Sequence, residues 1–204
     1  MLMNIGVFFL WLSLASNGED SPFMVRHFLV SWSALEYHRY WTALTSVFSH
    51  NLFWHLFLNM YVLGSFGDIV EEALGTWRFV TFYLIAGVIS SLSHSLISAF
   101  LLNEKDLSAL GASGAISGVI VVFAFLYPRD RIYLFGLIPI PAAWGAALFI
   151  GLDLWGLIRQ SKGGGLPIGH GAHLGGAFAG AVYFLFYLRG KLGANLYDWR
   201  HSTG

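Results

Sequence analysis

The sequence predicts an all-α polytopic membrane protein made of a single domain with six transmembrane helices. Its 204 residues are 56% hydrophobic and only 11% charged, whereas about a quarter of the residues of a soluble domain are charged. Six apolar segments, several of them near the roughly 20 residues that a helix needs to cross a bilayer, account for this composition. The 11 basic residues balance 11 acidic ones, which excludes nucleic acid as a partner, and the lack of cysteine excludes disulfides and thiolate metal sites.

The six apolar segments define the expected helices. No Lys or Arg precedes the first segment, Met1 to Ala15, so a signal peptide is the less favoured interpretation of it. The fifth segment contains Pro139 and Pro141. The expected helices cover residues 1–15, 51–66, 77–102, 113–127, 132–158 and 169–188 of one domain spanning 1–204.

The connection between the first two helices, Ser21 to Ser49, is too long for a tight turn and too mixed in composition to span a membrane. Aromatic residues such as Trp32 and Trp41 stand beside Arg26 and Arg39 in it. This mixture is typical of the headgroup zone. We therefore expect a structured first loop embedded in the membrane surface.

The fourth helix is short. From Ser113 to Tyr127 it would be about 22 Å long at the usual rise of 1.5 Å per residue, less than the roughly 30 Å of a hydrocarbon core. Pro128 and Arg129 fix its far end at the water boundary. Its near end, at Ser113, is therefore expected below the opposite membrane surface.

An even number of helices places both chain ends on the same side of the membrane. Arg129 and Arg131 lie in one short connection, and Arg189 and Lys191 follow the last helix. Because basic residues favour the cytoplasmic side, we expect an integral protein of the plasma (inner) membrane with cytoplasmic termini.

Polar groups at membrane depth are costly and by default mark function. The small-residue turn Gly111 to Gly114 delivers Ser113 to the start of the short helix. Free backbone N–H groups and the positive end of the helix dipole favour a developing negative charge there, so the serine hydroxyl would lie beside an oxyanion site. The alternative is that these glycines only let helices approach closely.

A second cluster opens the sixth helix. His173, Gly176 and Gly180 share one helix face, which could pack backbone to backbone against another helix. If that partner is the glycine-bearing fourth helix, His173 comes within hydrogen-bond reach of Ser113. A serine next to an imidazole is the minimum for nucleophilic acyl transfer, whereas a structural interhelix hydrogen bond is the alternative for His173.

A third cluster begins the second helix. His55 and Asn59 share a helix face and offer two donors that could hold an oxyanion together with the Ser113 backbone N–H. A metal site is a weaker interpretation, because neither an HExxH pattern nor a cysteine accompanies the histidines, and we expect no metal and no cofactor. The histidines that could contribute to such a site are His50, His55, His170 and His173.

Together, the three clusters resemble the rhomboid family of intramembrane serine proteases. The resemblance runs roughly from the second helix to the sixth and rests on four motifs in order. These are a histidine-and-asparagine motif, a Gly–Glu–Gly spacing, a GxSG nucleophile motif, and an alanine–histidine motif followed by spaced glycines. They stand at His50, His55 and Asn59; at Gly67, Glu71 and Gly75; at Gly111 to Gly114; and at Ala172, His173, Gly176 and Gly180.

The resemblance implies a serine endopeptidase that cleaves transmembrane or membrane-adjacent segments of protein substrates in the lipid bilayer. It implies a catalytic Ser113–His173 dyad, with an oxyanion hole formed by His55, Asn59 and the Ser113 backbone. It also implies that the fifth helix and the following loop form a lateral gate, with Trp155 as the gate aromatic.

The sequence departs from the family pattern near the proposed dyad. Ser117 stands where some members carry a tyrosine that stacks on the histidine, so His173 must be supported from elsewhere. For Asp153 we favour an interfacial or capping role near the end of the fifth helix over a place in a triad. We expect Glu71 and Glu72 in a loop after the second helix, and His94 as a packed histidine.

Two other functions remain as alternatives. One is a non-catalytic rhomboid-like protein that binds membrane proteins without cutting them, which would be expected to have lost the serine or the histidine. The other is a small transporter or channel, for which the sequence offers no internal repeat.

Overall fold

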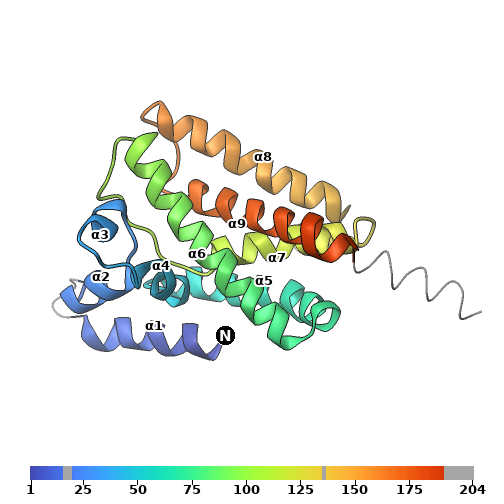
Figure 1. Ribbon diagram of the computed structural model, residues 1–204, viewed down its shortest axis with the longest axis horizontal. Helices are drawn as coiled ribbons and strands as arrows, with labels where there is room; N and C mark the ends of the chain where they lie inside the picture. Colours follow the sequence, from blue (N-terminus) through green and yellow to red (C-terminus); the bar gives the residue numbers. More distant parts are fainter. Residues whose placement is uncertain (16–19, 135–136, 191–204) are drawn as a thin grey trace, which may run out of the picture.

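The computed structural model describes residues 1–15, 20–134 and 137–190, so Lys191 and the end of the predicted domain lie outside the described part (Figure 1). The described residues form a bundle of helices with one small hairpin. The long helices are α1 (Leu2–Leu14), α5 (Phe53–Leu74), α6 (Thr76–Phe100), α7 (Ser113–Leu126), α8 (Ala142–Ser161) and α9 (His170–Tyr183), which continues as the π-helical turn η2 (Phe184–Leu188). The shorter elements are α2 (Pro22–Phe28), α3 (Trp32–Glu36), α4 (Thr42–Thr45), the 3-10 turn η1 (Ser46–Phe48), β1 (Arg131–Leu134) and β2 (Ile138–Pro141).

The short helix α7 forms the centre of the bundle. It packs against α5, α6 and α9, and most of its residues are buried, as expected for a helix that is apolar all round. Figure 1 shows α8 along one edge of the bundle, against α9, and α1 along the opposite edge, against α5. The helix α7 therefore begins inside the bundle, at Ser113.

Three helices of the described part are long and apolar enough to cross a membrane: α6, α8, and α9 together with η2. The helices α1 and α7 are apolar but shorter. The helix α5 has 22 residues, but His55, Asn59 and Asp68 interrupt its apolar sequence. The structure thus supports a mostly helical protein with three candidate spans, and the six-helix count stays a prediction.

The second helix extends further than predicted. Instead of ending at residue 66, α5 continues to Leu74, so Glu71 and Glu72 lie in its last turn and the expectation of a loop there is wrong. Gly75 ends the helix with a φ of 80°, a conformation that residues with a Cβ rarely adopt. Because α6 begins directly at Thr76, the whole connection between the two helices is this one glycine.

The predicted helix over 132–158 is wrong in its first third. Residues 131–134 and 138–141 form an antiparallel hairpin in which Tyr133 lies opposite Pro139, and α8 begins only after Pro141. Proline lacks the backbone N–H and its ring clashes with the preceding helical turn, so Pro139 and Pro141 cannot lie inside a regular helix. Pro141 instead stands as the residue before the first turn of α8.

The long first loop is structured, as predicted, and it fixes the segment that leads to Ser113. It contains α2, α3, α4 and η1. Val30 and Ala109 form a β-bridge, with nitrogen-to-oxygen distances of 3.0 Å and 2.8 Å, and the Gly111 N–H donates to the Ser46 carbonyl at 2.9 Å. The depth of the first loop in a membrane stays a prediction.

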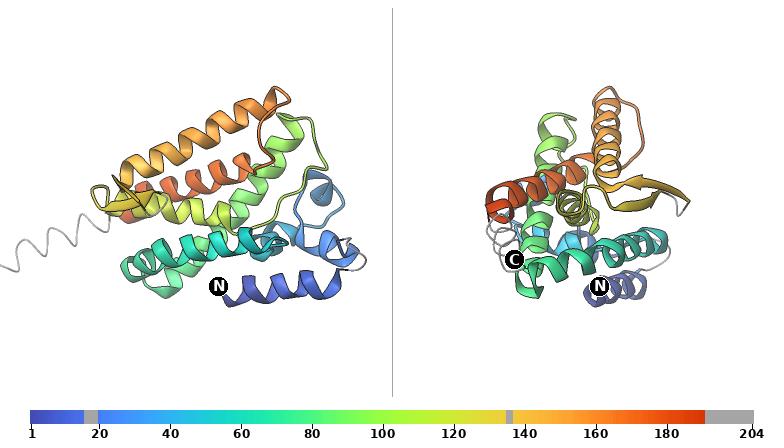
Figure 2. Two further views of the ribbon diagram at one scale, coloured as in Figure 1. Left: turned by 180° about the vertical axis from the view of Figure 1, so that it is seen from behind. Right: turned by 90° about the vertical axis from the view of Figure 1, so that its right-hand side faces the viewer.

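Residues 101–112 run back along the bundle from the end of α6 to the start of α7 (Figure 2). The buried His94 holds this segment, because its Nε2 lies 3.0 Å from the Leu107 carbonyl. The predicted packing role of His94 is therefore confirmed.

The short helix α7 is much shorter than α6. A helix of 14 residues is about 21 Å long and one of 25 residues about 37 Å, so α7 spans only part of the length of α6.

Candidate active site

The helices α7 and α9 approach each other through glycines. A Cβ added to Gly176 would overlap the Gly114 carbonyl, and one added to Gly180 would overlap the Gly118 carbonyl. A Cβ on Gly118 would come within 2.9 Å of the Gly176 carbonyl oxygen. The predicted backbone-to-backbone packing of the glycine-bearing fourth and sixth helices is thus confirmed.

This contact makes Gly176 sensitive to substitution. Gly176→Ala is expected to lower the free energy of unfolding in detergent by about 3 kcal/mol, the upper end for overpacking, because the new methyl group meets backbone that cannot rotate away. Gly151→Ala on α8 is the matched control, since a Cβ there has no neighbour within 4 Å. Equal unfolding free energies of the two variants in a denaturant titration would rule out the close contact.

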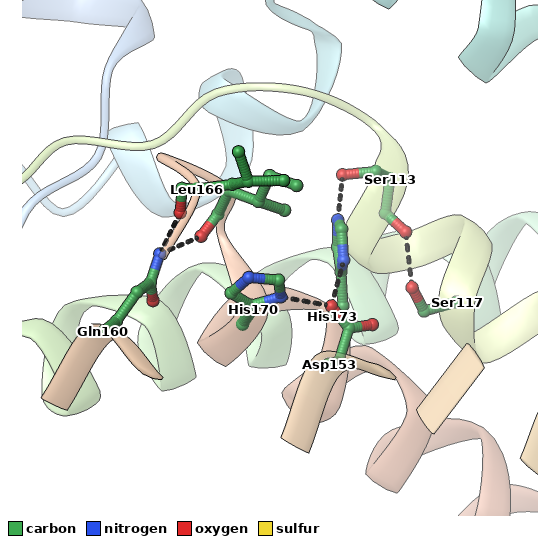
Figure 3. Close-up of polar contacts among 8 residues, drawn as sticks. Ser113, Ser117, Asp153, Gln160, Leu166, His170 and His173 are labelled. Carbon is green, nitrogen blue, oxygen red and sulfur yellow. Dashed lines mark hydrogen bonds and ion pairs between the residues drawn. The ribbon is translucent and has the colours of Figure 1, made fainter. Parts of the chain in front are cut away.

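The helix contact brings the predicted serine and histidine together (Figure 3). Ser113 Oγ lies 2.9 Å from His173 Nε2. Ser113 is the first residue of α7, and His173 lies in the first turn of α9, so each side chain stands at a helix start. The pair can pass a proton from the hydroxyl to the ring nitrogen.

Asp153 lies beside the same histidine, and the expected capping or interfacial role is wrong. It stands in the middle of α8 with only 4% of its surface exposed. Its Oδ1 accepts from His173 Nδ1 at 3.0 Å and from His170 Nδ1 at 2.6 Å (Figure 3). A carboxylate at the centre of a membrane helix costs about 2.5 to 3.5 kcal/mol without partners, and these two rings supply partners.

Because position 117 is a serine and offers no aromatic ring, His173 was expected to be supported from elsewhere, and its support comes from α8. The ring of Phe149 lies 5.6 Å from the His173 ring, tilted by 32°. Ser117 instead donates to the Ser113 carbonyl at 2.7 Å. Sequence reasoning missed Phe149, although its spacing of four from Asp153 places both residues on one face of α8.

His55 and Asn59 line the same cavity as Ser113, which has a volume of about 780 Å³. The His55 ring lies against Gly111, whose φ of 120° and missing Cβ leave room for it. Asn59 donates one amide hydrogen to the His55 carbonyl at 2.7 Å. Since the amide carries two hydrogens, the other one remains for a ligand in the cavity.

His50 supports the turn before the serine. It is fully buried, its ring lies 4.9 Å from that of His55, and its Nε2 accepts from the Ala112 N–H at 3.4 Å. Burial, with a further contribution from His55, lowers the pKa of His50 to about 4. The ring is therefore neutral near pH 7, as an acceptor nitrogen must be.

The loop after α8 lines this cavity through Pro167, Ile168 and Gly169, whereas Trp155, the expected gate aromatic, lies outside it. Trp155 is 63% exposed and does not line the cavity. If it acts as a gate, it does so from the exposed face of α8. Gln160 lies at the end of α8 and donates to the carbonyls of Leu166 and Ile168, both at 2.8 Å. Among the described residues, no group of three or more His, Asp or Glu side chains is arranged to hold a metal ion.

Three curated relatives are similar to this chain. They are "RHOMBOID-like protein 12, mitochondrial" of Arabidopsis thaliana (30% identity, covering 94% of this chain and 58% of the relative), "Rhomboid protein 1, mitochondrial" of Saccharomyces cerevisiae (37%, 68% and 39%) and "Presenilin-associated rhomboid-like protein, mitochondrial" of Mus musculus (36%, 70% and 37%). The chain thus spans between 37% and 58% of the length of these relatives. Because all three are mitochondrial by name, the expected plasma-membrane localisation with cytoplasmic termini is overturned.

The family model named "Rhomboid domain" matches residues 37–190. This range is more than half of the chain and contains α5 to α9 and the four motifs. The serine, the histidines and the glycine contacts described above all fall within it. The chain therefore belongs to the rhomboid family.

Proposed function

We propose that this protein is an intramembrane serine endopeptidase that cleaves transmembrane or membrane-adjacent segments of other proteins. The observation that carries the proposal is the 2.9 Å contact between Ser113 Oγ and His173 Nε2, at the edge of a cavity about 780 Å³ in volume. Membership of the rhomboid family supports it.

In the proposed mechanism Ser113 is the nucleophile and His173 the general base. His173 Nε2 takes the hydroxyl proton as Oγ attacks the carbonyl carbon of the scissile peptide bond. The protonated ring then gives this proton to the leaving amine, and the acyl-enzyme forms. A water molecule, deprotonated by His173, hydrolyses the ester and restores the serine.

The negative oxygen of each tetrahedral intermediate would be held by three donors. The Ser113 N–H lies at the start of α7, where backbone N–H groups have no helical partner. The second amide hydrogen of Asn59 and the ring of His55 face the same cavity. Each well-placed donor of this kind stabilises the transition state by about 3 kcal/mol.

The remaining parts of the proposal concern the membrane. We propose that residues 1–204 form one domain with six membrane-spanning helices, and that the first loop lies in the headgroup zone. Substrate helices would enter beside α8, with Trp155 on its exposed face at the gate. The 24 glycines and low charge of the chain are compatible with close helix contacts inside a bilayer.

The direct test is reconstitution of the protein in liposomes with a panel of single-span reporter proteins. We expect cleavage within or next to the reporter's transmembrane segment, as identified by mass spectrometry of the fragments. A serine-reactive fluorophosphonate should label the protein at Ser113 alone, because only this serine has an imidazole within hydrogen-bond distance among the described residues.

A binding protein without activity would give a different pattern. Reporters would co-purify with the chain and remain intact, and the fluorophosphonate would leave Ser113 unlabelled. That pair of results would replace the peptidase with the non-catalytic alternative.

A further inference from the structure

The carboxylate of Asp153 joins two histidines that come from a different helix. Its Oδ1 lies 2.6 Å from His170 Nδ1 and 3.0 Å from His173 Nδ1 (Figure 3). The three side chains are only 6%, 9% and 14% exposed, in the order Asp153, His170 and His173. Asp153 belongs to α8 and the two histidines to the first turn of α9, so this buried contact depends on how the two helices pack.

The contact decides which nitrogen of His173 can act as a base. An ionised carboxylate oxygen only accepts hydrogen bonds, so Nδ1 of each ring must carry the hydrogen. A neutral imidazole has only one N–H, so Nε2 of His173 keeps its lone pair. That lone pair faces the Ser113 hydroxyl at 2.9 Å. The other tautomer would place an N–H against the serine and could not take its proton.

We propose that Asp153 is a positioning residue that orients His173 and selects the tautomer in which Nε2 accepts the serine proton. This inference rests on the proposed function. When Ser113 attacks, its proton moves to Nε2 and the ring becomes an imidazolium, whose positive charge the Asp153 carboxylate balances. The proton stays on His173 until it passes to the leaving amine, and Asp153 takes none.

The same carboxylate oxygen is also held by His170. The ring of His170 lies over Gly156, one turn after Asp153 on α8, and a Cβ on Gly156 would overlap this ring. The N–H of His170 therefore approaches Oδ1 from a fixed direction. His170 thus steadies Asp153 without touching Ser113.

The helix α8 supplies a second contact to the same ring. Phe149 lies one turn before Asp153 on the same face of α8 and packs against the His173 ring. Phe149 restricts the tilt of the ring, and Asp153 fixes its rotation through Nδ1. Since Ser117 makes no contact of this kind and bonds to the Ser113 carbonyl, both supports of His173 come from α8.

The competing explanation is that Asp153 only clamps α8 to α9. In that case the shorter bond, to His170, would be the important one, and its loss should matter as much as the loss of Asp153. If Asp153 acts through His173, its substitution should lower kcat far more than a substitution of His170. The variants Asp153→Asn and His170→Gln separate these explanations, because both change one partner of the same bond.

The kinetic test uses the full chain in liposomes with a transmembrane reporter. For Asp153→Asn we expect kcat to fall by about 10²- to 10⁴-fold, with KM within about threefold of wild type. For His170→Gln we expect a loss in kcat of less than about tenfold. Asp68→Asn, which changes an exposed carboxylate on α5, is the matched control and should leave kcat unchanged. Equal losses in Asp153→Asn and His170→Gln would overturn the proposal in favour of the clamp.

A second measurement does not depend on activity. The ¹⁵N chemical shifts of the imidazoles report which ring nitrogen carries the hydrogen, and the His173 signals are assigned by their loss in His173→Gln. We expect the Nδ1–H tautomer in the wild-type protein and a mixture of tautomers in Asp153→Asn. A wild-type His173 with its hydrogen on Nε2 would overturn the inference, whether or not a reporter is cleaved. Absence of cleavage together with the expected tautomer would instead count against the proposed function alone.

Discussion

Ser113→Ala is expected to lower kcat for cleavage of a transmembrane reporter by about 10⁶-fold, which leaves only the residual catalysis of the oxyanion site and of substrate binding. Under the proposed mechanism, the substitution removes the oxygen that would form the acyl-enzyme, while the backbone N–H of residue 113 and the donors from α5 remain. An enzyme that loses its nucleophile keeps only the catalysis of its oxyanion site and its binding energy. The measurement is single-turnover cleavage in liposomes, followed over hours to reach slow rates.

The control must separate lost chemistry from lost structure. Ser65→Ala removes the same oxygen from an exposed serine of α5 that bonds only to the Tyr61 carbonyl of its own helix. This variant should cleave at the wild-type rate, and the two variants should unfold at similar denaturant concentrations. Cleavage by Ser113→Ala within tenfold of wild type would mean that another group attacks the peptide bond.

The sequence predicted the central contact well because helical spacing and glycine size determine it. Gly176 and Gly180 fall on the same face of α9 as His173, and any helix that packs there must present equally small residues. The fourth expected helix offers them beside Ser113. The glycine spacing therefore predicted both the helix contact and the pairing of Ser113 with His173, whose Oγ and Nε2 lie 2.9 Å apart in the structure.

The role of α8 could not be predicted in the same way. Phe149, Asp153 and Gly156 share a helix face, but the local sequence does not say which neighbouring helix that face meets. Asp153 was expected near a helix end because the predicted helix ended at residue 158, whereas it lies in the middle of α8 and its partners are 17 and 20 residues away along the chain. A buried carboxylate needs partners, and only the packing of α8 on α9 reveals which side chains supply them.

The errors at helix ends have a different origin. The apolar character of residues 132–141 led to the prediction of a helix where the structure has a hairpin, although Pro139 and Pro141 argue against a helix. In the opposite direction, Glu71 and Glu72 suggested a loop where α5 continues for two more turns to Gly75. Hydropathy describes where lipid could lie, whereas prolines and glycines determine where the backbone changes direction.

His173→Ala is expected to lower kcat by about 10⁴-fold or more. Without Nε2 the hydroxyl keeps its proton, and an un-ionised serine is a poor nucleophile. The variant also leaves the Asp153 carboxylate with His170 as its remaining partner, so its unfolding must be measured alongside its activity. His27→Ala, a change of the same kind in the first loop at a ring that stacks on Trp41, serves as the control and should stay near the wild-type rate.

The double variant is the sharpest test of whether Ser113 and His173 act as a functional pair. If Ser113 and His173 act as one unit, Ser113→Ala combined with His173→Ala should cleave no more slowly than Ser113→Ala alone, because the histidine has nothing to activate once the hydroxyl is gone. Independent roles would instead multiply, and the double variant would lose about the product of the two single effects. Fluorophosphonate labelling of Ser113 should vanish in His173→Ala for the same reason. Persistent labelling there would assign the activation of Ser113 to a group other than this imidazole.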